Sequence, residues 1–211
     1  DTFVSDEQGR KNRIGMDVVL GTTLAISTCT ETGWFDIKYH LKKRDGKFIS
    51  SFGESEWLWP QDPFMADRVL YIPLLVVEPN PDAAGPFKFK ISGHKIARIV
   101  NYEDADPGRW IADYMDIRSG IAEGVMAFAT TSAVYHEHVY FYPLYASTFD
   151  NAPVFGNILA RIPLERLSDP GKAVEYFTKD GKWKREPEPS EVKIIISAGV
   201  SELSVRYHED D

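Results

Sequence analysis

Cysteine is almost absent from this chain, since Cys29 is the only one among 211 residues. One cysteine can neither close an internal disulfide nor build a thiolate metal cluster. The chain also lacks any run of about 20 apolar residues, which is the length that a membrane-spanning helix requires. Its first residues lack the basic start and apolar stretch of a signal peptide. We therefore expect no disulfide framework, no membrane span and no metal site.

Basic residues are in the minority as well. The chain carries 24 Lys and Arg against 32 Asp and Glu, a formal net charge of -8, whereas nucleic-acid affinity depends largely on Lys and Arg contacts to phosphate. No GxGxxG, P-loop, HExxH or GxSxG motif occurs, so dinucleotide, nucleoside triphosphate and serine-hydrolase chemistry have no support. We expect no nucleic-acid partner and no cofactor.

Helical periodicity is also missing, and this indicates the fold class. Short segments rich in Val, Ile, Tyr and Phe alternate with turn residues, which is the pattern of β-strands. In the middle of the chain we expect strands near Pro63–Ala66, Val69–Val77, within 87–100 and at Trp110–Asp116. In the following part we expect them near Ala127–Tyr135, Val139–Ala146, Asn157–Ile162 and Val174–Thr178. The sequence predicts an all-β protein.

An internal repeat is present. Val69–Leu74 is echoed 70 residues later by Val139–Leu144. Two further segments recur with the same internal spacing, 63 residues apart: Ala97-Arg98-Ile99 with Asp106-Pro107-Gly108, and Ala160-Arg161-Ile162 with Asp169-Pro170-Gly171. Leu24–Ser27 is a weaker echo of the Ala-Arg-Ile segments. Four-stranded units that repeat at this spacing are typical of β-propeller blades, which stack radially around a channel.

We therefore predict one partial, unclosed β-propeller domain over residues 1–211. Its approximate divisions are 1–56 for the end of a first blade, 57–118 for a second, 119–190 for a third and 191–211 for the start of a fourth. The alternative is a β-sandwich with a chance repeat. Leu203–Tyr207 alternates like a strand that has no hairpin partner after it, which favours a piece of a longer protein.

The 70-residue offset aligns Asp62, Ser132 and Glu202 at the starts of successive innermost strands, on one rim of the channel. Asp1 joins them, because an antiparallel hairpin returns the end of the strand at residues 1–4 to the same rim. Converging carboxylates suit the cleavage of glycosidic bonds, in which one acts as acid and another as nucleophile or base. The alternative is that each is a solvated or turn-capping carboxylate.

Aromatic residues accompany these acids. Trp57 and Trp59 precede Asp62 and suit stacking on sugar rings, although a Trp beside a Pro at the start of a strand more often packs between blades. His136 and His138 share a strand face, but the repeat aligns Glu137-His138 with the hairpin turn Asp67-Arg68. We therefore expect a turn at this position and no metal ion.

Several motifs together resemble a five-bladed propeller family, formerly of unknown function, that includes endo-D-arabinanases and is similar in architecture to arabinan- and xylan-cleaving furanosidases. They are Asp1-Thr2-Phe3-Val4 with Leu24–Ser27, Trp59-Pro60-Gln61-Asp62, Thr131–Val134 and Ser201–Tyr207. They cover nearly the whole chain in order. Asp1 resembles the aspartate of a Phe-Gly-Asp-Thr strand end, and Asp62 resembles that of a Trp-Pro-Gly-Asp motif in which Gln61 replaces the glycine.

The resemblance implies a glycoside hydrolase that acts on a furanose-containing polysaccharide such as arabinan. Asp1, Asp62 and Glu202 would be catalytic, and substrate would contact Trp57, Trp59, Gln61 and Ser132. It also implies an extracellular or cell-envelope location, a monomer at full length and a further acidic residue upstream of Asp1. Two alternatives stay open: a non-catalytic carbohydrate-binding or adhesion propeller, and a scaffold that presents loops to a protein partner.

Overall fold

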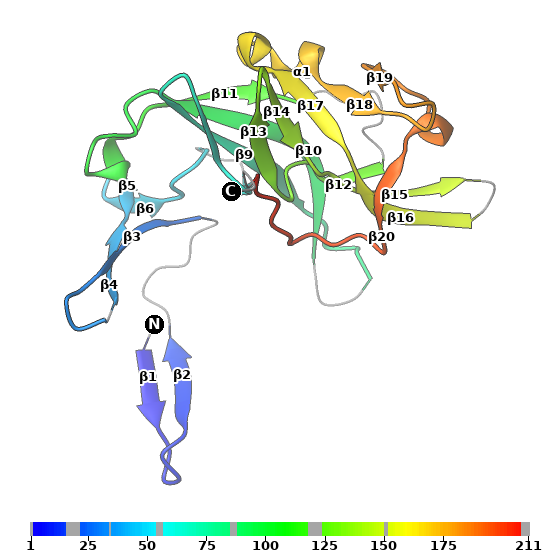
Figure 1. Cartoon of the computed structure of the whole chain (residues 1–211). Coiled ribbons are helices and arrows are strands. Elements are labelled where there is room, and N and C mark those ends of the chain that lie inside the picture. The colour runs from blue at the N-terminus through cyan, green and yellow to red at the C-terminus, as the bar shows by residue number, and fades with distance from the viewer. Residues whose placement is uncertain are drawn as a thin grey trace.

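The computed structural model describes residues 2–15, 22–33, 35–53, 57–84, 88–117, 124–149 and 152–207. Most of this part is β-strand, which confirms the all-β class (Figure 1). The described helices are single turns: η1 (Pro107–Arg109), η3 (Leu164–Arg166), α1 (Pro170–Ala173) and η4 (Pro189–Glu191). None of them has the length or apolar character to cross a membrane.

Three antiparallel hairpins precede the main sheets. They are β1 (Thr2–Ser5) with β2 (Lys11–Gly15), β3 (Leu24–Cys29) with β4 (Phe35–His40), and β5 (Lys42–Arg44) with β6 (Lys47–Ile49). The strands expected near residues 2–4 and 24–27 lie in β1 and β3. The β5–β6 hairpin turns at Asp45-Gly46, where both φ angles are positive, at 49° and 75°. Such a two-residue turn matches the twist of the flanking strands.

Residues 57–116 form a sheet that we call sheet I. Its strands are β7 (Trp57–Pro60), β8 (Phe64–Ala66), β9 (Val69–Pro79), β10 (Phe89–Ile99) and β11 (Ala112–Asp116). The order is β11-β10-β9-β7, and β8 pairs with the other half of β9. Because all pairs are antiparallel, sheet I is a meander of four strands whose first strand is interrupted between β7 and β8.

Residues 125–197 form two sheets, which we call sheet II together because they repeat this arrangement with more interruptions. Its strands are β12 (Val125–Ala127), β13 (Ser132–Tyr135), β14 (His138–Phe141), β15 (Leu144–Phe149), β16 (Ala152–Ile158), β17 (Ala160–Pro163), β18 (Glu175–Phe177), β19 (Trp183–Lys184) and β20 (Ile194–Ser197). One half has the order β12-β15-β16-β20 and the other β13-β14-β17-β18-β19. Each of its first three strands is thus split into two parts, and β20 carries the pairing to residue 197.

The repeated tripeptides have equivalent structures in the two sheets. Asp106-Pro107-Gly108 begins η1 and Asp169-Pro170-Gly171 begins α1, so each forms the helical turn between a third and a fourth strand. The hairpin turn expected at Asp67-Arg68 is confirmed, with φ angles of 47° and 59°. Its counterpart lies at residues 136–137, between β13 and β14, where His136 has a φ of 50°.

Strand pairing moves the repeat by one residue at this hairpin. Ala66 pairs with Val69, and Tyr135 pairs with His138, so the equivalent turns are 69 residues apart rather than 70. Turn geometry fixes the register of a hairpin. Counted from the turn, the residue equivalent to Asp62 is therefore Thr131, and Ser132 follows it.

Both faces of sheet I are buried, which explains why β9 is a continuous apolar run. Neighbouring residues of a strand point to opposite faces. Tyr71 belongs to a core that sheet I shares with sheet II, whereas Ile72 belongs to a second core that includes Phe52 and, at its margin, Leu24. A sheet covered on both sides needs apolar residues at every position rather than at alternate ones.

The core between the two sheets contains large, fully buried side chains, among them Phe128 and Phe141 at 4.8 Å between ring centroids. His94 also lies at this interface, where its Nε2 is 3.1 Å from the Val125 carbonyl oxygen. Its Nδ1 is buried and has no hydrogen-bond partner within the part of the chain that the structure describes. Burial lowers the pKa of His94, although the Val125 contact opposes this. The neutral imidazole is therefore the form that fits between the sheets.

The segment at Leu203–Tyr207 is not a strand, contrary to the prediction. It lies along sheet II, where the Val205 amide donates to Oγ1 of Thr131 at 3.2 Å and the Tyr207 and Tyr135 rings are 5.0 Å apart. A strand requires backbone groups as ladder partners. Here the acceptor is the Thr131 side chain rather than a backbone carbonyl group. Residues 203–207 therefore alternate in sequence like a strand but form no backbone ladder with sheet II.

Candidate functional site

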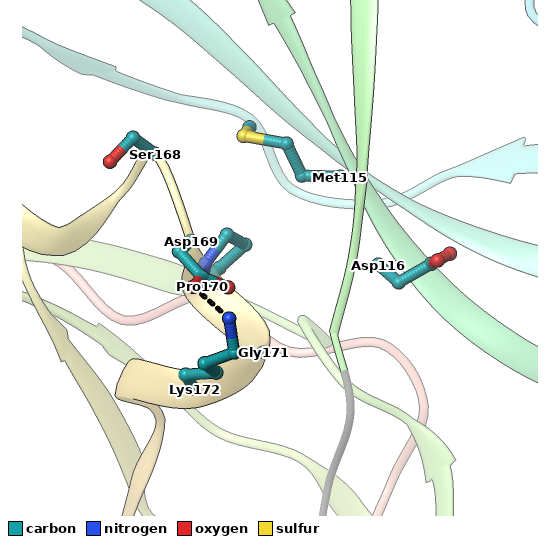
Figure 2. Close-up of a pocket in the computed structure, with 7 residues that line it drawn as sticks. All are labelled: Met115, Asp116, Ser168, Asp169, Pro170, Gly171 and Lys172. Atoms are coloured by element: carbon teal, nitrogen blue, oxygen red, sulfur yellow. Dashed lines mark hydrogen bonds and ion pairs between the residues drawn. The ribbon is translucent and has the colours of Figure 1, made fainter.

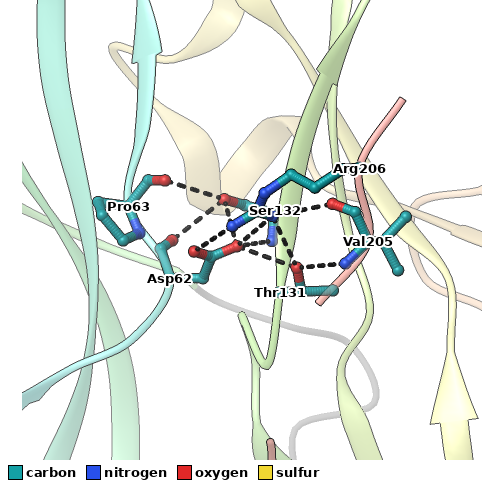
Figure 3. A network of polar contacts seen from close by, with 6 residues as sticks. All are labelled: Asp62, Pro63, Thr131, Ser132, Val205 and Arg206. Atoms are coloured by element: carbon teal, nitrogen blue, oxygen red, sulfur yellow. Dashed lines mark hydrogen bonds and ion pairs between the residues drawn. The ribbon is translucent and has the colours of Figure 1, made fainter. Parts of the chain in front are cut away.

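Asp62 lies in the interruption between β7 and β8, beside the first strand of sheet II (Figure 3). Oδ2 of its carboxylate accepts hydrogen bonds from the Ser132 amide at 2.7 Å and from Oγ1 of Thr131 at 3.0 Å. The Ser132 hydroxyl donates to the Asp62 carbonyl oxygen at 3.1 Å. One acidic residue of sheet I is thus bonded to two consecutive residues of sheet II.

The C-terminal segment adds a third element to this cluster. Nη1 of Arg206 lies 3.4 Å from Oδ2 of Asp62, and Nη2 lies 3.5 Å from Oδ1 (Figure 3). The carboxylate side chain is 19% exposed and the guanidinium side chain 56%. Among the described residues, Oδ1 has only this long contact from Arg206, whereas Oδ2 is surrounded by donors. The cluster of Asp62, Thr131, Ser132 and Arg206 is hereafter called the rim cluster.

The surroundings of Asp62 favour its ionised form. Partial burial by itself would raise the pKa of this carboxyl group. The hydrogen bonds from Ser132 and Thr131, together with the hydrogen bond and the positive charge of Arg206, outweigh burial and lower the pKa below its ordinary value. Donors that bond the charged form stabilise that form. At neutral pH Asp62 is therefore a carboxylate, which can act as a base or pair with a cation but has no proton to donate.

Proline explains why the rim cluster includes a serine hydroxyl. The Gln61 amide donates to the Pro73 carbonyl oxygen at 2.8 Å, so the backbone of Pro73 faces the first strand. Proline has no N–H, and Asp62 therefore receives no ladder hydrogen bond from it. In sheet II the equivalent donor is Tyr142, whose amide donates to the Thr131 carbonyl oxygen at 3.3 Å. The Ser132 hydroxyl provides Asp62 with the donor that Pro73 lacks.

The predicted site residues are brought together only in part. Asp62 and Ser132 are in direct contact. Glu202 lies on the same C-terminal segment as Arg206, but its side chain is exposed and takes no part in the bonds that hold Asp62. Asp1 lies outside the described residues.

Gln61 and the tryptophans lie around the rim cluster. Oε1 of Gln61 accepts a hydrogen bond from the Ala129 amide at 3.1 Å, a second link between the two sheets. Trp59 packs edge-on against Phe89 with ring centroids 4.8 Å apart. Trp57, two residues earlier on the same face of β7, is 45% exposed and is the more accessible of the two.

Sequence reasoning did not single out Thr131 or Arg206. Thr131 could have been found from its position directly before Ser132 in the repeat. Arg206 carried no signal of its own, because it occupies a polar position in an alternating segment, where arginine is ordinary. Its contact with Asp62 spans 144 residues of chain and follows from the folded arrangement alone.

A pocket of about 350 Å³ lies elsewhere between the two sheets, at the junction of β11 with α1 (Figure 2). Asp116 and Asp169 both line it. Each is already paired, Asp169 with Lys172 at 2.8 Å and Asp116 with Lys95 at 3.8 Å. These carboxylates are neutralised by their own neighbours, so the pocket has little charge left with which to hold a ligand.

Comparison with known proteins adds no assignment: no family model matches the chain, and no curated protein or solved structure is significantly similar to it.

Proposed function

We propose that this chain is part of a β-propeller glycoside hydrolase that acts on a furanose-containing polysaccharide such as arabinan. Two four-stranded antiparallel meanders whose first strands adjoin support the propeller, since blades pack in this way around a channel. Residues 203–207 continue the series by lying against β13, as β13 lies against β8. The first strands of successive units thereby follow one another in chain order.

The hydrogen-bond donors that surround the Asp62 carboxylate are the observation that supports the hydrolase. Glycosidases of both stereochemical classes pair one carboxylate, acting as nucleophile or base, with a carboxylic acid that protonates the leaving oxygen. Asp62 suits the carboxylate role, because its donors favour the charged form. The acid must then be another residue, for which Glu202 and Asp1 are the candidates. The exposed Trp57 would offer a ring face to the sugar.

A non-catalytic carbohydrate-binding propeller is the second candidate, and one observation favours it. Oδ2 of Asp62 already receives hydrogen bonds from Ser132 and Thr131 and a contact from Arg206. A carboxylate held in this way links two blades and contributes to a rim that binds sugar hydroxyls, with no acid–base work. A scaffold that binds a protein partner requires no sugar binding at all.

Hydrolysis and binding assays on the full-length gene product separate these candidates. We expect release of reducing sugar from arabinan or xylan, with a loss of roughly 10²–10⁴-fold in rate for both Asp62→Asn and Glu202→Gln, the range for a proton-transfer residue. Asp113→Asn is the matched control, because its side chain is 66% exposed on the far edge of sheet I. Its activity should be unchanged.

Each alternative outcome has a different meaning. Sugar binding without cleavage by the unmodified protein would favour the carbohydrate-binding propeller and end the hydrolase proposal. The absence of binding to any glycan on an array would favour the protein-binding scaffold. A rate loss in Asp62→Asn that parallels a loss of thermal stability, while Glu202→Gln keeps full activity, would assign Asp62 to blade linkage rather than catalysis.

A further inference from the structure

Basic side chains gather at a pocket that shares no residue with the rim cluster. The pocket has a volume of about 400 Å³ and lies between the β5–β6 hairpin and η1. Small-molecule sites commonly have volumes of about 300–1,000 Å³. The charged or titratable residues that line it are His40, Lys42, Lys43, Arg44, Asp106 and Arg109.

The charge of this pocket is opposite to that of the chain. Two lysines and one arginine from the hairpin line it together with Arg109 from η1, and Asp106 is the single carboxylate among the lining residues. Four permanent cations against one anion leave an excess of three positive charges, in a chain whose net charge is -8. Concentrated charge of one sign in a concave site raises the local concentration of ions of the opposite sign.

Lys42 is the most enclosed of these cations. Its Nζ donates to the Ser51 carbonyl oxygen at 2.9 Å, and among the described residues it has no carboxylate partner. Partial burial lowers the pKa of this ammonium group, which shows that its charge is incompletely solvated. Lys43 places its own Nζ 4.5 Å from the centre of the Phe48 ring. An anion in the pocket would provide Lys42 with the counter-charge that its surroundings lack.

Asp106 holds the two walls of the pocket together. Its carboxylate lies 2.8 Å from Nδ1 of His40, accepts a hydrogen bond from the Gly108 amide at 2.9 Å, and lies 3.9 Å from Nε of Arg109. The contact with His40 joins segments 66 residues apart. Oδ1 of Asp106 therefore has two close partners, and Oδ2 lies near the Arg109 guanidinium.

We propose that this pocket binds a small molecule that carries a phosphate or sulfate monoester. A tetrahedral oxyanion accepts several charged hydrogen bonds at once, and a guanidinium such as that of Arg109 presents paired donors that match its oxygens. Ammonium groups such as those of Lys42 and Lys43 supply point charges. The volume also leaves room for an organic group attached to the anion. This inference does not depend on the proposed sugar-cleaving activity.

Titration calorimetry with inorganic phosphate, inorganic sulfate and glucose 6-phosphate tests the proposal. We expect saturable binding with a Kd of about 1 mM or lower, and a loss of roughly tenfold or more in the double variant Lys43→Gln/Arg109→Gln. Both side chains are at the surface, so the fold should persist, which circular dichroism checks. If inorganic phosphate binds as tightly as glucose 6-phosphate, the free anion is the ligand and the assignment to a monoester is overturned. Tighter binding of glucose 6-phosphate assigns the site to a monoester.

The internal repeat supplies a matched control. Lys172 follows Asp169-Pro170-Gly171 as Arg109 follows Asp106-Pro107-Gly108, and their side chains are 79% and 74% exposed. Lys172→Gln removes one positive charge from the equivalent position of sheet II and should leave binding unchanged. An equal loss in Lys172→Gln, unchanged binding in the double variant, or no binding of any of the three probes would overturn the proposal.

Discussion

Sheets I and II share a repeat, but the proline of the second strand faces a different neighbouring strand in each. Pro73 faces the first strand of sheet I, where it removes a ladder donor opposite Asp62. In sheet II the proline stands one residue further along relative to the hairpin turn. The Ile158 amide donates to the Pro143 carbonyl oxygen at 3.0 Å, so Pro143 faces the third strand instead. The position of a proline in the register thus determines which neighbouring strand loses its partner.

This difference matches the continuity of the second and third strands, although the first strand is interrupted in both sheets. In sheet I, β9 and β10 each run unbroken for 11 residues, and only the first strand is interrupted. In sheet II the second and third strands are both split at the level of Pro143, between β14 and β15 and between β16 and β17. The interruption in sheet I leaves the Asp62 carbonyl oxygen without a ladder donor. The Ser132 hydroxyl of sheet II donates to this oxygen instead.

The largest effect in this comparison should come from Ser132. Ser132→Ala removes the hydroxyl that replaces the missing Pro73 donor, so the Asp62 carbonyl oxygen loses its partner. We expect a loss of about 1–3 kcal/mol in the free energy of unfolding. Pro73→Ala restores an N–H on the same side, and in that background the cost of Ser132→Ala should be clearly smaller. Denaturant unfolding of the four proteins of this double-mutant cycle measures the coupling, and additive effects would contradict the account.

A smaller difference in stability is expected between two ion pairs that occupy equivalent positions of the two sheets. Arg161 and Glu175 are 2.8 Å apart with side chains 22% and 21% exposed, whereas Arg98 and Asp113 are 3.4 Å apart with side chains 38% and 66% exposed. The Arg161 guanidinium also lies 4.2 Å from the Trp183 ring centre, a contact that β19 adds to sheet II.

We expect Arg161→Gln to lower the free energy of unfolding by about 1–2 kcal/mol, through loss of a partly buried charged hydrogen bond and of the ring contact. Arg98→Gln should cost less than about 0.5 kcal/mol, as exposed ion pairs do. Thermal unfolding at two salt concentrations is the measurement. Equal costs would show that the β18–β19 hairpin contributes nothing to the Arg161 pair.

Much of the fold could be predicted from local sequence. The strands of sheet I followed from a run that is apolar at every position from Val69 to Leu75, because both faces are buried. The two Asp-Pro-Gly tripeptides were recognised as parts of the repeat, and the structure shows that each begins a helical turn. The repeat also placed Asp62 beside the first strand of sheet II. Its exact equivalence with Ser132 was off by one residue, because the register depends on the hairpin turn.

The rest depends on contacts between distant segments. Arg206 meets Asp62 across 144 residues, and Asp106 meets His40 across 66. Neither pair has a spacing that a sequence pattern can reveal. The strand expected at 203–207 would have required a backbone partner. The alternation of polar and apolar side chains cannot predict whether such a partner is present. The same reason hid the basic pocket, whose walls come from two separate segments.

The titration of the Asp62 carboxyl group tests the central claim most directly, namely that this group is an ionised link held by the first strand of sheet II. Its lowered pKa implies that its contribution to stability is present above the unfolded-state value of about 3.9 and is lost as the pH falls through the folded value. Carbon-13 NMR of the side-chain carboxyl should show a pKa below about 3.9. That pKa should rise in Thr131→Val and stay unchanged in the remote Lys172→Gln. A value at or above 3.9, or one that Thr131→Val does not move, would contradict the account.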